Sequence, residues 1–400
     1  MKIVIITQWF SERMGYAENL LPKALAKQGV EVHVISSTAQ IYYNSPKYKE
    51  VYESFIGPNI LETGKKQIDG YTLHRLPIYK PGIMTGSGPG IKGLMELLQE
   101  LKPDVIQVFE IEHVETYTAA YYCKKTTGCK LFTECHVHAS VLRKGNHKSF
   151  SEKINSFINF LNPRIRLIKN TSHLTYAIAE DVKDIVLSYY HFPVEKVIVQ
   201  SLGVDCDIFS PVLSDMDREE RALLRTELGI SNGDVLCIYT GRFTRDKMPH
   251  CLAEAINYLH QEGYVRYKAI FLGSGTQEDI SFIQSQSGCR ILPFVPMDQL
   301  PRYYRASDIG VWPREESTSQ LDAIACGLPV ILSNRIKVTE RVEGNGLMYE
   351  EGNFKDLADK ILSLDNETRK KMSLAGIKKA KELFSWDSIA KERISHYLNC

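Results

Sequence analysis

Residues 235–247 read VLCIYTGRFTRDK and residues 313–330 read PREESTSQLDAIACGLPV, and these two stretches decide the fold. The first begins with an apolar run, Val235–Tyr239, of the kind that forms a strand buried on both faces of a parallel sheet. Gly241 then permits a tight turn. Because open α/β sheets bind ligands at the carboxyl ends of their strands, this turn is a candidate binding loop.

Two cations follow that turn, Arg242 and Lys247. A guanidinium binds two phosphate oxygens at once, and an ammonium acts as a movable point charge. The pair would neutralise a diphosphate. The alternative is that both are solvated surface cations, which is common for single Arg and Lys residues.

The second stretch places Ser317–Gln320 before a helical run, 321–326, that Gly327 closes and Pro329 follows. Ser and Thr at a helix start can cap the helix, and the free N–H groups there also bind anions. Capping and phosphate binding are compatible, so both interpretations stay open.

Two histidines, His136 and His138, follow the predicted strand 130–134 at its carboxyl end. A His-x-His pair can ligate a metal, but the sequence offers no third ligand at sensible spacing. Each histidine is either an ordinary hydrogen-bonded residue or part of a site.

Together these motifs resemble those of the retaining glycosyltransferases of family 4. The matching segments are Gly241, Arg242 and Lys247, the pattern 322–330, and the shorter matches at 102–106 and 203–211. The resemblance implies an α/β chain with the GT-B fold, two Rossmann-like domains facing each other across an interdomain cleft. It implies an acceptor-side domain over 1–205, a nucleotide-sugar domain over 206–385, and a helix over 386–400 that crosses back to the first domain.

The resemblance also implies an activity: transfer of a sugar, with retention, from a nucleotide diphosphate sugar to a glycan, lipid-linked or small-molecule acceptor. The departing phosphate would deprotonate the acceptor, and no cofactor or metal would be needed. The implied catalytic residues are Arg242, Lys247, His136 and Glu316. The implied donor-binding residues are Gly15, Gly241, Gly273, Val295, Glu315, Ser317, Thr318, Ser319, Gln320 and Asp322.

One carboxylate departs from the family pattern. The family has Glu, seven residues, then a second Glu; here Asp322 stands at the second position, and Arg314 stands at the first. Asp322 keeps a carboxylate for the ribose, while Glu315 or Glu316 would contact the sugar. The shift motivates two alternatives: a catalytically silent sugar-nucleotide-binding protein, and a GT-B sugar-nucleotide epimerase that needs no acceptor.

Composition agrees with a two-domain enzyme. The chain has 400 residues, of which 44% are apolar, enough for two cores of ordinary size. A net charge of +1 gives no support for nucleic-acid binding. Nine cysteines without a repeating frame suit a reducing compartment, and the first apolar run is too short for a secretory signal. We therefore expect a cytoplasmic protein.

Strand-like and helical patterns alternate along the chain, which predicts βαβ units and parallel sheets. The expected strands are 2–7, 31–37, 104–109, 130–134, 235–239 and 269–272, and the expected helices are 18–28, 93–101, 115–125, 215–227 and 386–397.

Residues 150–169 combine an apolar stripe with Lys153, Arg164, Arg166 and Lys169. Such a stripe edged by cations can lie on an anionic membrane surface, which would make contact with the inner membrane face a further partner. The alternative is that the apolar residues pack on the domain core. Pro163 prevents a single long helix.

Overall fold

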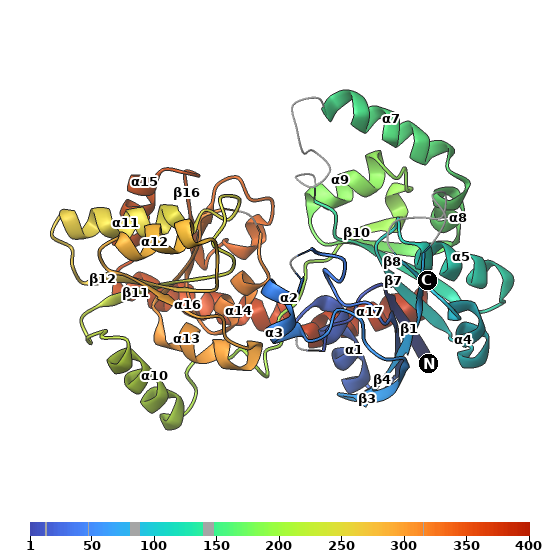
Figure 1. Cartoon of the computed structure of the whole chain (residues 1–400), viewed down its shortest axis with the longest axis horizontal. Coiled ribbons are helices and arrows are strands. Elements are labelled where there is room, and N and C mark those ends of the chain that lie inside the picture. The colour runs from blue at the N-terminus through green and yellow to red at the C-terminus, as the bar shows by residue number, and fades with distance from the viewer. Residues whose placement is uncertain (13, 47, 81–88, 139–147, 315) are drawn as a thin grey trace. The chain divides into compact units, whose positions relative to one another are not determined.

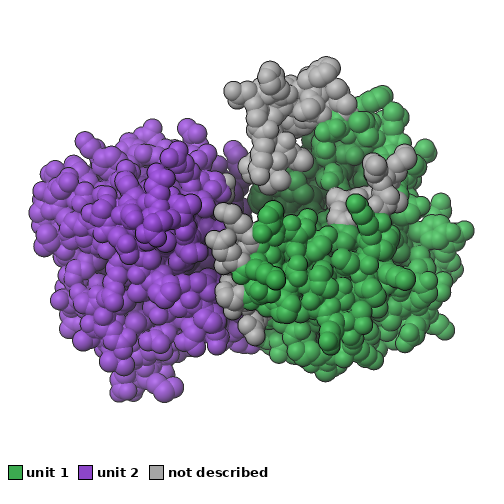
Figure 2. Space-filling model, viewed as in Figure 1, with its two compact units in different colours: residues 1–202, 389–400 green, residues 203–388 purple. Residues whose placement is uncertain are grey.

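The computed structural model describes the 400-residue chain except for residues 13, 47, 81–88, 139–147 and 315. It divides into two compact units: unit 1 is Met1–Leu202 together with Ile389–Cys400, and unit 2 is Gly203–Ser388. Figure 2 draws them in green and purple. The expected boundary after residue 205 falls close to this division, and the sequence returns to unit 1 near its C-terminal end.

Unit 1 is built on an eight-stranded sheet with the order β10-β9-β8-β7-β1-β2-β4-β3. Every neighbouring pair is parallel except β3 and β4. A short pair of strands, β5 and β6, lies apart from this sheet. The strands are β1 Lys2–Thr7, β2 Glu31–Ser37, β3 Gly64–Ile68, β4 Tyr71–Leu76, β5 Ile78–Tyr79, β6 Gly90–Ile91, β7 Val105–Phe109, β8 Lys130–Cys135, β9 Ser172–Ala177 and β10 Val197–Val199.

The hairpin β3–β4 is a feature that the sequence patterns did not predict. Strand β3 reads GKKQI and is exposed over most of its length, so it carries no buried alternation to signal a strand. It lies at the sheet edge, where lysines are common because they discourage pairing with another chain.

The helices of unit 1 pack on this sheet and on one another; α5 contacts β7 and β8, and also packs against α4 and α8. Pro163 ends α7 and begins α8 as expected, with Asn162 as the N-cap residue whose side chain accepts from the Arg164 N–H. The helices are α1 Ala17–Lys27, α2 Tyr48–Val51, α3 Glu53–Ile56, α4 Leu94–Leu101, α5 Val114–Lys125, α7 Lys148–Leu161, α8 Pro163–Thr171, α9 Glu180–Ser188, the 3₁₀ turn η1 Val194–Lys196, and α17 Trp386–Asn399, whose residues from Ile389 onward belong to unit 1.

Unit 2 has a six-stranded, fully parallel sheet with the order β13-β12-β11-β14-β15-β16. Strand β11 lies inside it and is buried throughout, which accounts for its continuous apolar sequence. The strands are β11 Val235–Thr240, β12 Tyr267–Leu272, β13 Cys289–Leu292, β14 Ile309–Trp312, β15 Val330–Ser333 and β16 Gly346–Tyr349.

Helices cover both faces of this sheet: α11 packs with α12 and α15, and α13 packs with α10 and α14 (Figure 1). The expected α/β architecture with parallel sheets in two domains is thus confirmed. The helices of unit 2 are α10 Asp215–Glu227, α11 Pro249–Gln261, α12 Gln277–Ser285, η2 Met297–Gln299, α13 Leu300–Ala306, α14 Ser319–Ala325, η3 Thr339–Arg341, α15 Phe354–Ser363, α16 Asn366–Lys379 and η4 Ala380–Phe384. Within the described ranges, no helix is both long enough and apolar enough to cross a membrane.

Candidate active site

The loops after β11 and β12 lie side by side at the carboxyl edge of the unit 2 sheet. The Gly241 N–H donates to the Leu272 carbonyl at 3.0 Å, and the Phe243 N–H donates to the Ser274 carbonyl at 2.8 Å. The two strands are adjacent and parallel, so the sheet itself brings these loops together.

Glycine at position 273 is required by this close approach. Its φ is +149°, and a Cβ there would lie 1.9 Å from the Gly241 carbonyl oxygen, so no other residue fits. The family resemblance implies that Gly273 binds the donor. The structure adds a second reason for the glycine, which is the neighbouring loop.

The loop after β14 joins the same edge through two contacts. The Trp312 indole Nε1 donates to the Thr240 carbonyl and to Ser319 Oγ, both at 3.1 Å. Lys247 Nζ donates to the Glu316 carbonyl at 3.1 Å. The lysine of the first decisive stretch therefore touches the second stretch, although 69 residues separate them.

The Arg242 side chain is exposed, and within the described part of the chain it forms no ion pair. Its backbone is held instead, because the Tyr239 hydroxyl donates to the Arg242 carbonyl at 2.8 Å. A fixed backbone with an unengaged guanidinium suits an anion-binding role.

The Ser317–Gln320 segment begins α14, but not through a side-chain cap. Thr318 occupies the N-cap position in helical conformation and its side chain makes no capping hydrogen bond. Ser317 and Ser319 hydrogen-bond to each other at 2.7 Å between their Oγ atoms. The interpretation as a plain N-cap is therefore wrong for Thr318, and the Ser317 and Ser319 hydroxyls form a small polar cluster.

Arg341 is a buried cation at this site that the sequence patterns did not single out. Its Nη1 donates to the Ser317 carbonyl at 3.0 Å and to Gln320 Oε1 at 2.9 Å. Burial lowers its pKa, and the charges of Glu340, Glu316 and Asp322 oppose that effect. Nothing in the sequence around Arg341 distinguishes it from an ordinary surface arginine.

Two carboxylates of the second stretch lie close to Arg341. Glu316 accepts the Lys337 N–H at 3.0 Å. Burial raises the pKa of Asp322 to about 8; Asp205 adds to the shift and Arg341 opposes it. Asp322 is therefore largely protonated at neutral pH. A perturbed carboxyl of this kind is a frequent mark of a functional site.

The remaining predicted residues are less closely connected. Val295 lies between β13 and η2 and is partly exposed. Gly15 precedes α1 in unit 1. Glu315 lies outside the described residues, so only Glu316 of that pair is placed.

In unit 1, His136 lies directly after β8 and is held by Glu134. The His136 Nε2 atom donates to Glu134 Oε1 at 2.8 Å, and the Phe109 ring packs edge-on against the imidazole. The other carboxylate oxygen of Glu134 accepts from Arg393 Nη1 at 2.5 Å. Arg393 is on α17 and also donates from Nε to Gln200 Oε1 at 2.7 Å.

The charges around His136 keep its imidazole protonated. Burial alone would lower its pKa, but the hydrogen bond and charge of Glu134, with Glu110 and Glu18, raise the pKa to about 9. Glu110 accepts the His136 backbone N–H at 3.2 Å and has a left-handed backbone, with φ of +66°. Non-glycine residues rarely adopt this conformation, and those that do are often found at functional sites.

His138 has a different partner, Asp181, at 3.2 Å. His136 and His138 therefore do not converge on a shared ligand. Among the residues that the structure describes, no group of three or more His, Cys, Asp or Glu side chains could hold a metal ion.

Comparison with known proteins defines the class. Residues 20–208 match the family described as Glycosyltransferase Family 4, and residues 234–367 match Glycosyl transferases group 1. A solved structure of Anabaena Alr3699/HepE in complex with UDP superimposes with a TM-score of 0.68 at 17% identity, covering 100% of both chains. The fold is GT-B, and the chain is a glycosyltransferase by class.

Two curated relatives are also glycosyltransferases by name. The chain is 25% identical to the uncharacterized glycosyltransferase MJ1607 of Methanocaldococcus jannaschii over 99% of this chain and 98% of the relative. It is 26% identical to the D-inositol 3-phosphate glycosyltransferase of Xylanimonas cellulosilytica over 58% of each chain. The match to MJ1607 is full-length, whereas the matches to other curated relatives span little more than half of their length. The protein belongs to the family 4, group 1 glycosyltransferases.

Proposed function

We propose that this protein transfers a glycosyl group, with retention at the anomeric carbon, from a nucleotide diphosphate sugar to an acceptor hydroxyl. The observation that carries the proposal is the convergence of Gly241, Lys247 and the Ser317–Asp322 segment at one sheet edge in unit 2. Parallel α/β sheets bind nucleotides at such an edge.

Negative charge develops on the departing diphosphate during transfer. Arg242 and Lys247 would stabilise that charge electrostatically, because Lys247 is already held beside the Glu316 carbonyl and the Arg242 guanidinium is exposed to an incoming anion. In this proposal, cationic side chains neutralise the diphosphate, and no metal is invoked. The departing phosphate would then accept the proton of the acceptor hydroxyl.

Asp322 would hold the nucleotide ribose, and Glu316 would contact the donor sugar. In unit 1, His136 would act as an imidazolium that positions the donor sugar or the acceptor, since its pKa is about 9. The Anabaena HepE structure contains UDP, and one relative is named for D-inositol 3-phosphate. UDP-sugars and phosphorylated cyclitols are therefore the first donors and acceptors to test, beside glycans and lipid-linked acceptors.

The test has two stages. Thermal stabilisation by a panel of nucleotide diphosphate sugars identifies the donor, because a ligand of the folded state raises its apparent stability. Turnover is then measured with and without acceptors, and NMR of the product reports the anomeric configuration. Transfer with retention supports the proposal; an epimerised donor formed without acceptor supports the epimerase alternative; binding without turnover of any acceptor supports the silent alternative.

We further propose that unit 1 docks on an anionic membrane surface through α7. Its side chains Phe157, Ile158, Phe160 and Leu161 are between 53% and 62% exposed, so the expectation that they pack on the domain core is wrong for these four. At helical spacing they occupy one broad face. Lys169 Nζ lies 5.7 Å from the Phe160 ring centroid, which places a cation beside the apolar face. An apolar face bordered by cations matches anionic lipid.

A further inference from the structure

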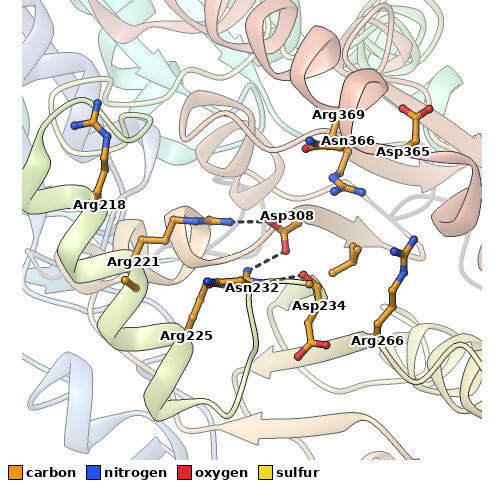
Figure 3. Close-up of a pocket in the computed structure, with 13 residues that line it drawn as sticks. Arg218, Arg221, Arg225, Asn232, Asp234, Arg266, Asp308, Asp365, Asn366 and Arg369 are labelled. Carbon is orange, nitrogen blue, oxygen red and sulfur yellow. Dashed lines mark hydrogen bonds and ion pairs between the residues drawn. The ribbon is translucent and has the colours of Figure 1, made fainter.

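A charged pocket lies at the edge of the unit 2 sheet opposite the candidate active site (Figure 3). It has a volume of about 520 Å³ and is lined by the residues just before β11, β12 and β14, by α10 and by the start of α16. Pockets of this size hold small molecules. The six residues of β11 separate this edge from the Gly241 loop by roughly 20 Å at about 3.3 Å per residue.

The lining is strongly basic. It contains five arginines and three aspartates: Arg218, Arg221, Arg225, Arg266, Arg369, Asp234, Asp308 and Asp365. Counted over these lining residues alone, the net charge of the pocket is positive.

Part of this charge is structural. Asp308 pairs with Arg221 at 2.8 Å and with Arg225 at 2.9 Å, and Arg225 donates further bonds to the Ser231 and Asp234 carbonyls. These contacts tie α10 to the strands' amino ends. Because their guanidinium groups are already engaged, Arg221 and Arg225 form the floor of the pocket rather than its ligand-binding groups.

The acidic residues are engaged as well. Asp234 accepts from Lys268 Nζ at 2.8 Å. Asp365 caps α16, accepting the Thr368 N–H at 2.7 Å. The three carboxylates therefore already have cationic or N–H partners.

Arg266 and Arg369 are held differently, by neutral groups. Arg266 lies over the Tyr267 ring at 5.1 Å and donates to the Tyr267 hydroxyl at 3.0 Å. Arg369 donates from Nη1 to the Leu364 carbonyl at 2.6 Å. Neither forms an ion pair with any residue that the structure describes. Figure 3 shows both guanidinium groups on the same side of the pocket, with the side chain of Asn366 near Arg369.

We propose that this pocket binds a phosphate-bearing small molecule, with Arg266 and Arg369 as its principal anion ligands. Each neutral contact orients a guanidinium and leaves other N–H donors for a tetrahedral anion, which arginine binds in bidentate fashion. Asn232 and Asn366, which also line the pocket, add amide donors. The site is separate from the proposed donor loops and goes beyond the proposed transfer reaction.

The test is calorimetric titration of the full chain with sodium pyrophosphate at low ionic strength. The donor loops would also bind this probe, so the titration is run in an Arg242→Ala, Lys247→Ala background. In that background, Arg266→Ala with Arg369→Ala should weaken the remaining binding by about tenfold or more, as expected for loss of charged hydrogen bonds.

The matched control is Arg290→Ala with Arg302→Ala, which removes two arginines of the same unit that do not line the pocket. An equal loss of pyrophosphate affinity in this control would mean that the net charge of the protein, and not the pocket, accounts for the binding, and it would overturn the proposal. No remaining binding in the Arg242, Lys247 background would also overturn it, because the donor loops would then account for all pyrophosphate bound. Neither outcome bears on the transfer activity, which is measured separately.

Discussion

Glu134 and Arg393 form a buried ion pair, with 2.5 Å between Oε2 and Nη1 and each side chain only 1% exposed. The two residues are 259 positions apart in the sequence. Burial works against ionisation of Glu134, but the charge of Arg393 and the hydrogen bond from His136 lower its pKa to about 2. A helix near the C-terminal end thus fixes the carboxylate that holds the candidate catalytic histidine.

The first prediction concerns this carboxylate. Glu134→Gln removes the negative charge beside His136, so the His136 pKa should fall from about 9 toward the ordinary value of 6.5. NMR titration of the histidine ring resonances measures the change. Asp181→Asn, which removes the partner of His138, is the control and should leave His136 unchanged. A His136 pKa that stays near 9 in folded Glu134→Gln protein would show that Glu134 is not its main partner.

The second prediction tests the diphosphate site. Arg242→Ala should lower turnover about 10²-fold to 10³-fold at saturating donor, as expected for loss of one charge that stabilises the departing diphosphate. Arg245→Ala removes an exposed cation three residues along the same loop and is the matched control. Near-normal turnover in Arg242→Ala, or an equal loss in Arg245→Ala, would remove Arg242 from the site.

The third prediction follows from the pKa of Asp322, about 8 in the free protein. An ionised carboxylate accepts a ribose hydroxyl bond more strongly than a protonated one, so nucleotide affinity should increase as the pH rises through 8. Asp322→Asn should abolish this pH dependence and weaken binding by about 1–3 kcal/mol. Calorimetry at several pH values measures both. Unchanged affinity with loss of folding would make Asp322 a packing residue only.

The fourth prediction is a decline of stability with rising pH. Burial raises the pKa of Glu18 and Glu115 to about 7, and the pKa of His136 is about 9. Asp322, with a pKa of about 8, behaves in the same way. The folded protein holds these protons where the unfolded chain has released them, so the free energy of unfolding falls as the pH rises from about 6.5 to 9. Groups with lowered pKa values make the free energy of unfolding rise with pH instead: His74 and His113, at about 4, do so up to about pH 6.5, and Glu134, at about 2, does so below about pH 4.5.

Urea unfolding at pH 5, 7 and 9 measures this slope. Glu18→Gln with Glu115→Gln should make the decline up to about pH 7 shallower than in the native protein and leave the decline between pH 7 and 9, which Asp322 and His136 cause. A free energy of unfolding that rises steadily from pH 5 to 9 would contradict the assignment of these buried protons.

The fifth prediction concerns the exposed face of α7. The native protein should float with vesicles of phosphatidylglycerol and phosphatidylcholine but not with phosphatidylcholine alone. Phe157→Ser with Phe160→Ser should reduce flotation strongly, since each removes a large apolar side chain from the lipid. Leu223→Ser with Leu374→Ser changes two side chains of unit 2 that are 61% and 71% exposed, and it should have no effect. Equal flotation of all forms would exclude α7 as the contact.

Much of the fold could be predicted because local patterns carry it. The helix 215–227 and the strands at 2–7 and 31–37 have the bounds that the sequence indicated. The hairpin β3–β4 could not be predicted, since an exposed lysine-rich edge strand buries too little to leave a pattern. In unit 2, the contact of Lys247 with Glu316 follows from strand adjacency, which a list of strands does not fix.

Other parts of the candidate site depend on partners distant in sequence. From the sequence alone, Arg341 is indistinguishable from a surface arginine. The fold buries it and brings it into contact with Ser317 and Gln320. Arg393 is a similar case. The sequence contains 48 acidic residues, and no local pattern indicates that Glu134 is the one that pairs with Arg393. Local composition predicts elements well, whereas specific buried pairs arise from tertiary packing.

The passage of the chain from unit 1 to unit 2 and back has a consequence for biosynthesis. Arg393 is translated only after all of unit 2, so the emerging unit 1 must wait for its last helix while residues 203–388 are made, roughly 10–40 s at typical rates. During that interval Glu134 lacks Arg393 and keeps only His136 as a cationic partner, so the buried cluster of unit 1 is incompletely neutralised. A released chain truncated after Ser388 should therefore be digested by protease in unit 1 while unit 2 stays resistant. The chaperone-dependent stage of this protein would lie in the half that is made first.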